Sequence, residues 1–239
     1  MPTLDEAFET MRSALVDSFG RCRSEFEGLD PFEAVIAVLL SRTLGESSWR
    51  TALDGLREAG LLTPEGLADV EVIELGDAVG RKGRSVSPET LAPLRHFARW
   101  LVEQQDGQVD SLFDPDRSTG WLREELAAIK GVGIKGADAL LLHAMKRPSY
   151  PVDRATFRVL VRHAWLDPTT TYEEARDLLV DHGLETVRDP EGEAAGVLTE
   201  LAHGMEQLGR RFCRPAAPRC DGCPLEGLLP EGGPRGAEE

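Results

Sequence analysis

The chain has 239 residues, of which 41% are hydrophobic, and it carries a formal net charge of -15 at pH 7. This length suits one large domain or two small ones, and the hydrophobic share is that of a globular protein with a core. No apolar run approaches the roughly 18 residues of a membrane span, and the acidic N-terminus lacks the features of a signal peptide. We therefore expect a cytoplasmic protein with no membrane partner.

Charge is unevenly distributed along the chain. Residues 167–200 contain ten acidic residues and two arginines, whereas residues 208–220 contain four arginines and no acidic residue. A second basic cluster lies at residues 81–84. Three further arginines recur every four residues and would form one stripe on a helix: Arg154, Arg158 and Arg162. Such basic spots on an acidic body are able to bind a phosphate backbone, but an ordinary solvated helix face explains the stripe equally well.

The hydrophobic pattern predicts helices almost throughout, because no convincing run alternates apolar and polar residues as a strand would. Asp30 and Pro31 are typical of a helix start, and the nearly apolar FEAVIAVLLS that follows predicts a helix buried in the centre of a bundle. Thr171 and Glu174 have the spacing of a capping box. Further helices are predicted at residues 47–59, 64–78, 89–105, 119–129, 134–146, 153–164, 171–182 and 192–209.

The sequence IKGVGIK indicates a tight reversal between two of these helices. Gly131 and Gly133 permit positive φ angles and leave backbone N–H groups uncovered, while Val132 is able to pack between the helices. Uncovered N–H groups beside a helix N-terminus form an anion site that suits a phosphate. The alternative is a plain connection in which the glycines serve only the reversal.

The cysteines are concentrated near the C-terminal end of the chain. Cys213, Cys220 and Cys223 lie within eleven residues, and Cys22 is the fourth. In a reducing compartment such a cluster indicates a metal site more often than a disulfide framework. Thiolates suit an iron–sulfur cluster and zinc equally well.

These motifs together resemble the endonuclease III group of DNA glycosylases. IKGVGIKGADALLL followed by PVDRATFRVL resembles the family pattern LPGVG-x-K-T-A followed by V-D-T-H-x-x-R-V. PFEAVIAVLLS resembles the family's first core helix, and CRPAAPRCDGC resembles the opening of its iron–sulfur loop. The resemblance runs from about residue 30 to residue 223, with the motifs in the family's order and spacing.

The resemblance implies an all-α, two-lobed helix-hairpin-helix (HhH-GPD) glycosylase fold. Residues 30–147 would form a six-helix barrel domain that contains the hairpin. Residues 1–29 and 148–239 would form an iron–sulfur cluster domain from both chain ends. The partner implied is double-stranded DNA with a damaged base or an abasic site, bound by a monomer at the nucleoid.

The resemblance also implies a bifunctional DNA glycosylase and AP lyase in base excision repair, with oxidised pyrimidines as substrates. The family's nucleophilic lysine falls on Lys135, where the helix dipole favours a neutral amine, and its essential aspartate falls on Asp153. The alternative for each residue alone is a solvated lysine and a simple helix cap. Two other functions stay open: a lyase that acts mainly on abasic sites, and a non-catalytic DNA-binding hairpin module.

The cysteine spacing matches three of the four ligands in the family's [4Fe–4S] loop, C-x6-C-x2-C-x5-C. The fourth position holds Leu229. Cys22 is the preferred candidate for the fourth ligand, His203 or water is an alternative, and loss of the cluster is another.

The chain also departs from the family where S-x-Q normally follows the first core helix. Here the sequence is Ser41-Arg42-Thr43, so Arg42, Thr43 or the 80–86 loop would fill the gap left by a flipped base. The residues expected to bind DNA are Gly131, Val132, Gly133, Arg42, Thr43, Lys82, Arg84, Arg154, Arg214 and Arg219.

Overall fold

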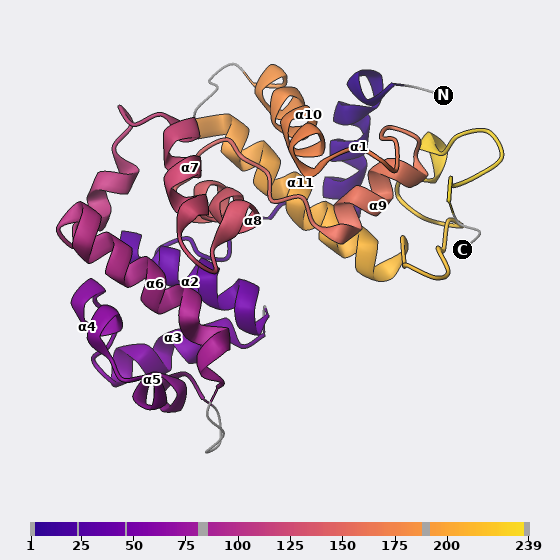
Figure 1. Cartoon of the computed structure of the whole chain (residues 1–239). Coiled ribbons are helices and arrows are strands. Elements are labelled where there is room, and N and C mark those ends of the chain that lie inside the picture. Colours follow the sequence, from indigo (N-terminus) through magenta and orange to yellow (C-terminus); the bar gives the residue numbers. More distant parts are fainter. Residues whose placement is uncertain (1–2, 23, 46, 81–85, 188–191, 237–239) are drawn as a thin grey trace. The chain divides into compact units, whose positions relative to one another are not determined.

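A computed structural model of the chain describes residues 3–22, 24–45, 47–80, 86–187 and 192–236 (Figure 1). Every regular element in these ranges is helical, so the all-α prediction is confirmed. Contacts within the chain define two compact units, residues 26–145 and residues 1–25 with 146–239. Among the described helices, none is both long enough and apolar enough to cross a bilayer.

The unit formed by residues 26–145 is built around one buried helix. Its helices are α2 (Pro31–Leu44), α3 (Trp49–Glu58), α4 (Pro64–Asp69), α5 (Val72–Val79), α6 (Pro88–Gln105), α7 (Thr119–Ala128), α8 (Gly133–Ala139), a 3-10 helix (Val109–Phe113) and a π-helix (Leu140–Ala144). The side chain of Asp30 accepts a hydrogen bond from Glu33 N at 2.9 Å, and Pro31 occupies the first turn of α2, as predicted. Residues 34–40 are all buried, and α2 contacts α3, α6, α8 and the π-helix.

The helix predicted at residues 64–78 is wrong, because the structure has two helices there. Thr63 caps α4, and the backbone of Val70 is extended, with φ −57° and ψ 139°. The break directs the two helices to different neighbours: α4 packs on α6, whereas α5 packs on both α3 and α6. Helix periodicity alone does not reveal this break, since Val70 is apolar and its side chain is buried.

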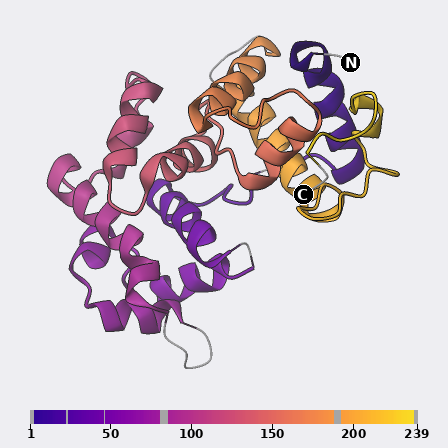
Figure 2. The same ribbon diagram turned by 45° about the vertical axis from the view of Figure 1, so that its right-hand side comes forward.

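The unit formed by both chain ends has four α-helices in its described residues. They are α1 (Leu4–Phe19), α9 (Arg154–Arg162), α10 (Tyr172–Glu185) and α11 (Gly192–Arg211), with a short 3-10 helix at Glu226–Leu228. Figures 1 and 2 both show α1 beside α11, although these helices are far apart in sequence. Gly204 permits this approach, since a Cβ atom there would lie 2.8 Å from Leu15 Cβ. Thr171 and Glu174 form the predicted capping box of α10.

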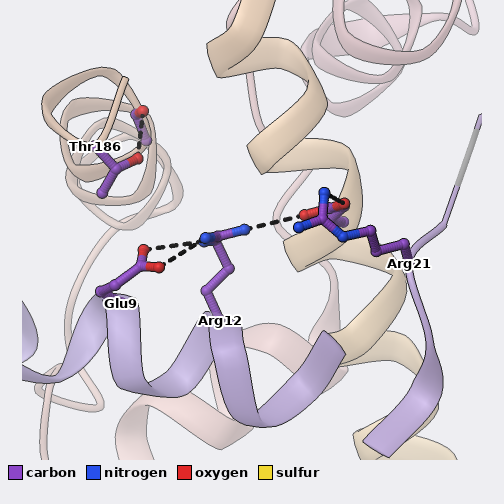
Figure 3. Close-up of polar contacts among 6 residues, drawn as sticks. Glu9, Arg12, Arg21 and Thr186 are labelled. Atoms are coloured by element: carbon purple, nitrogen blue, oxygen red, sulfur yellow. Dashed lines mark hydrogen bonds and ion pairs between the residues drawn. The ribbon is translucent and has the colours of Figure 1, made fainter. Parts of the chain in front are cut away.

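A polar contact joins α1 to α11 as well. Arg12 Nη2 lies 2.6 Å from Glu9 Oε1 on its own helix, and Arg12 Nη1 lies 3.1 Å from Glu200 Oε2 on α11 (Figure 3). Arg21 approaches the same Glu200 carboxylate at 3.8 Å. The hydrogen bond from Arg12 holds the pKa of Glu9 below its usual value. Because these groups are partly exposed, each pair contributes at most about 1 kcal/mol to stability.

The packing of α3 on α5 yields a stability prediction. A Cβ atom at Gly55 would overlap the carbonyl oxygen of Ala78, so Gly55→Ala forces the two helices apart. We expect this change to lower the free energy of unfolding by about 1–3 kcal/mol in urea titrations. Gly120→Ala in α7 is the matched control, because nothing lies within 4 Å of its Cβ position. Equal stability of the two variants would contradict the packing described here.

Candidate functional site

The reversal between α7 and α8 is a tight hairpin built by Gly131, Val132 and Gly133. Both glycines have positive φ angles, +86° and +62°, which other L-residues rarely adopt. Val132 is only 5% exposed and belongs to the core, so its predicted packing between the helices is confirmed. Its N–H donates to the carbonyl of Ile129 at 3.0 Å. Val132 therefore holds the hairpin in place with its side chain and its backbone.

The hairpin also packs tightly against α6 and against itself. A Cβ atom at Gly131 would lie 3.0 Å from Pro93 Cγ on α6, and one at Gly136 would lie 2.8 Å from Val132 Cγ1. His96 Nδ1 donates to the carbonyl of Lys130 at 2.8 Å, which fixes the approach to the hairpin. The described backbone hydrogen bonds do not include the N–H groups of Gly131 or Gly133. The rigid hairpin therefore presents donors that suit an anion.

Lys135 lies in the first turn of α8, directly beyond the hairpin. Its side chain is exposed, and the neighbouring Ile134 is 40% exposed, so this turn faces solvent. Three residues further along the same helix, Asp138 is fully buried. Its carboxylate accepts two hydrogen bonds from Arg123 of α7, at 2.6 and 3.0 Å.

The ion pair between Arg123 and the buried Asp138 ties α7 to α8 behind the hairpin, and the sequence analysis missed it. Such a two-bond pair fixes geometry more tightly than a single hydrogen bond does. The sequence feature that could have indicated this pair is Asp138 itself, a single acidic residue within the apolar run GADALLL. The pair fixes the helix that carries Lys135.

Asp153 is the N-cap of α9. Its Oδ1 accepts a hydrogen bond from Thr156 N at 2.6 Å, and its side chain is exposed. The described contacts include no hydrogen bond for Oδ2. One carboxylate oxygen therefore fixes the side chain, and no described hydrogen bond engages the other.

A buried tyrosine contacts Thr156, the residue whose N–H donates to Asp153. The hydroxyls of Tyr150 and Thr156 are 3.3 Å apart, and Tyr150 is 1% exposed. Burial, and to a smaller extent the nearby Asp153 charge, raises the pKa of Tyr150, so its phenol stays protonated. No sequence motif indicated this contact. Lys135 and Asp153 belong to different units.

The candidates for filling the gap left by a flipped base have different surroundings. The side chain of Arg42 reaches α8, because a Cβ atom at Gly136 would lie 3.7 Å from Arg42 Nε. The Thr43 hydroxyl donates back to the carbonyls of Leu39 and Leu40, at 3.0 and 3.1 Å. Arg42 is thus the candidate whose side chain lies against α8, the helix that carries Lys135. Lys82 and Arg84 lie outside the described residues.

The arginine stripe on α9 faces both solvent and protein. Arg154 is exposed, but Arg158 Nε donates to the carbonyl of Cys213 at 2.8 Å. Arg162 is 5% exposed and donates to the carbonyls of Arg214 and Pro215, at 2.6 and 2.7 Å. The interpretation of all three as one solvated or phosphate-binding face is therefore wrong. Two of them attach the cysteine loop to α9.

The loop after α11 gathers three cysteines around one pocket. Cys213, Cys220 and Cys223 line it together with Leu229, and the lining also includes Arg162 and His163. Burial, with a contribution from the neighbouring thiols, raises the pKa values of Cys220 and Cys223. Without a bound cation these thiols therefore favour their protonated forms.

The donor chemistry fits an iron–sulfur cluster in three of its four ligand positions, since cysteine thiolates are the usual ligands. Among the described residues, no group of three or more His, Cys, Asp or Glu side chains is placed to hold a single metal ion. Cys22 follows α1 and is half-buried, but it does not line the pocket. Arg214 and Arg219, on the same loop, are exposed.

Comparison with known proteins gives relatives along nearly the whole chain, although no protein-family model matches it. Endonuclease III of Thermotoga maritima is 29% identical over 219 residues, which cover 91% of this chain and 90% of the relative. Endonuclease III of Haemophilus influenzae is 28% identical and covers 86% of both chains. The thymine/uracil-DNA glycosylase of Pyrobaculum aerophilum is 27% identical and covers 82% of this chain and 78% of the relative.

Solved structures share the fold. A non-covalent endonuclease III–DNA complex superposes with a TM-score of 0.68 over 97% of both chains, at 22% identity. A thermostable thymine-DNA glycosylase gives a TM-score of 0.67 over 98% of this chain and 96% of its own, at 16% identity. The hairpin, the helical fold and the similarity along most of both sequences agree, and the chain is similar to the endonuclease III group of helix-hairpin-helix proteins in both sequence and fold.

Proposed function

We propose that the protein is a DNA-repair glycosylase that removes damaged bases from double-stranded DNA and then cleaves the strand at the abasic site. The observation that carries the proposal is the exposed Lys135 in the first helical turn beyond a rigid hairpin with uncovered N–H groups. Relatives named as endonucleases and DNA glycosylases along most of the sequence support it. The enzyme would act as a monomer on chromosomal DNA.

The hairpin would hold a phosphate of the damaged strand. The N–H groups of Gly131 and Gly133 would donate to phosphate oxygens, a contact that positions DNA without reading its sequence. Arg42 lies against the same helix as Lys135 and would contact the nucleotide under repair. Exposed arginines elsewhere would add backbone contacts: Arg154, Arg214 and Arg219.

Lys135 would be the nucleophile. Its neutral amine would attack C1′ of the deoxyribose, forming a C–N bond as the bond between the sugar and the base breaks. Ring opening of the sugar yields an imine, the Schiff base. Loss of a C2′ proton then expels the 3′ phosphate, which is β-elimination and cuts the strand. Water finally releases Lys135 from the imine.

Asp153 would supply the negative charge that this reaction needs. Departure of the base builds positive charge on the sugar, and a carboxylate held in a fixed orientation stabilises that charge. The hydrogen bond from Thr156 N to Oδ1 provides the fixed orientation, and Oδ2 would interact with the sugar.

A [4Fe–4S] cluster is the cofactor proposed for the cysteine loop, with Cys213, Cys220 and Cys223 as ligands. The cluster would brace the loop that presents Arg214 and Arg219. Cys22 stays a predicted fourth ligand. The chemistry at Lys135 and Asp153 involves no step at the cluster.

Oxidised pyrimidines are the proposed substrates, and the main alternative is a lyase that acts on preformed abasic sites. A panel of duplexes, each with one lesion or one abasic site, separates the two. A glycosylase releases the base from a lesion duplex, whereas a lyase cuts only the abasic duplex. Borohydride reduces the Schiff base and so links the enzyme covalently to DNA. A non-catalytic binding module forms no Schiff base and would give no covalent adduct.

Lys135→Ala should abolish the borohydride-trapped adduct and strand cleavage while DNA affinity changes little, because only the nucleophile is lost. Lys130→Ala is the matched control, since Lys130 is exposed and directly precedes the hairpin. Denaturing gels of the trapped complex and binding titrations measure both properties. A normal amount of adduct in the Lys135 variant would show that another amine forms the Schiff base.

Asp153→Asn should slow base release by on the order of 100-fold or more, because the positive sugar loses its counter-charge. Asparagine and serine both cap helices well, so Asp153→Asn and Asp153→Ser should keep the α9 start and the melting temperature. Single-turnover rates and thermal melting test this separation. Rates near that of the unmodified enzyme would mean that Asp153 is only a cap.

Gly133→Asp should weaken binding to damaged and undamaged DNA alike, since it places a negative charge beside the proposed phosphate. Gly133→Asn is the control, because asparagine tolerates the left-handed backbone and adds no charge. We expect about tenfold lower affinity for the aspartate variant relative to the asparagine variant. If the loss occurred with only one lesion, the hairpin would contact the base instead of the backbone.

A further inference from the structure

The exposed part of α8 is formed by two side chains, Ile134 and Lys135. Ile134 is 40% exposed, whereas the residues from Gly136 to Leu142, in α8 and in the π-helix that follows, are all buried. We infer that Ile134 packs against the deoxyribose of the DNA strand held by the hairpin and so positions that strand for Lys135. The inference rests on the function proposed above and adds an apolar DNA contact to it.

Ile134 lies between the two polar parts of the candidate site. The N–H groups of Gly131 and Gly133, which suit a phosphate, precede it in the hairpin, and Lys135 follows it directly. Neighbouring Cα atoms are about 3.8 Å apart, so a strand within reach of the lysine amine is also close to the preceding side chain. A strand bound by the glycine N–H groups and attacked by Lys135 therefore has to pass over Ile134.

The backbone and the side chain of Ile134 have little freedom to move. Two residues before it, Val132 is 5% exposed and belongs to the core. Gly131 lies against α6, where a Cβ atom would be 3.0 Å from Pro93 Cγ. Isoleucine is branched at Cβ and strongly prefers one χ1 rotamer in a helix. Because Ile134 is already ordered, its contact with DNA costs little conformational entropy.

The chemistry of the sugar suits an isoleucine. A deoxyribose presents C–H groups between its oxygens, and covering Ile134 with them removes apolar surface from water, which is favourable. This contact involves no charge and releases no counterions, so its contribution does not depend on salt in the way that a phosphate contact does. Salt dependence therefore distinguishes the contact at Ile134 from those made by the hairpin N–H groups and by arginines.

The first test measures the affinity of the full chain for a duplex that contains one tetrahydrofuran abasic analogue, which forms no Schiff base. Ile134→Ala should lower the affinity about fivefold, because apolar contact area is lost. The slope of log affinity against log salt concentration should stay unchanged. Ile134→Val should keep most of the affinity. Ile73→Ala is the matched control, since Ile73 is 76% exposed but lies in α5.

Two further measurements address the contact and the positioning role directly. In methyl NMR of the isoleucine-labelled chain, the Ile134 signal, identified by its loss in Ile134→Val, should shift when the duplex is added, and the Ile73 signal should not. With saturating amounts of a natural abasic duplex, Ile134→Ala should form the borohydride-trapped adduct about fivefold more slowly, because the sugar is held less well for Lys135. Ile134→Thr keeps the branched shape and should be affected similarly, and thermal melting checks that each variant is folded.

Unchanged affinity in Ile134→Ala, an equal loss in Ile73→Ala, or an Ile134 methyl signal that stays in place would overturn the inference. A shallower salt slope in Ile134→Ala would overturn it as well, because an ionic contact would then have been lost. Normal adduct formation at saturating DNA would contradict the positioning role. The proposed enzyme fails separately: a chain that binds the duplex through Ile134 but gives no borohydride adduct would contradict the lyase chemistry while confirming the contact.

Discussion

The candidate site depends on close packing that only glycine permits. At the hairpin, Gly131 lies against Pro93 of α6, and Gly136 leaves room for Val132. A side chain at either position would push the turn away from its supports. Because the side chain of Val132 is buried in the core, the first turn of α8 is held in place. The backbone of Lys135 is therefore held in place as well. A short glycine-rich sequence thereby sets the geometry on which the proposed chemistry rests.

Local signals made the helix starts predictable. Asp30 with Pro31, and Thr171 with Glu174, cap helices as their side-chain chemistry requires, because both motifs act within four residues. The hairpin was predictable for the same reason. The break at Val70 was not, since it depends on which neighbours α4 and α5 cover, and those neighbours lie elsewhere in the chain. Local chemistry therefore predicts where helices begin better than it predicts where tertiary contacts interrupt them.

The residues that support the candidate site were harder to predict than the site itself. Lys135 and Asp153 stand in motifs, whereas Tyr150 and the Arg123–Asp138 pair act through contacts that no spacing reveals. Arg158 and Arg162 show the same limit: their spacing predicts one helix face, but not that carbonyls of a distant loop accept their hydrogen bonds. Some arginines of this acidic protein thus bind its own backbone carbonyls.

The pairing of α1 with α11 has a consequence for how the protein is made. Residues 26–145 form a unit whose contacts are complete once that stretch has left the ribosome. The other unit has to wait, because α1 emerges first and its partner helix near residue 200 emerges late. Until then the apolar face of α1, with Phe8, Met11 and Leu15, has no native surface to cover it. The nascent chain is therefore most exposed to aggregation and proteolysis in this interval. A chain that ends before α11 would keep the apolar face of α1 uncovered permanently.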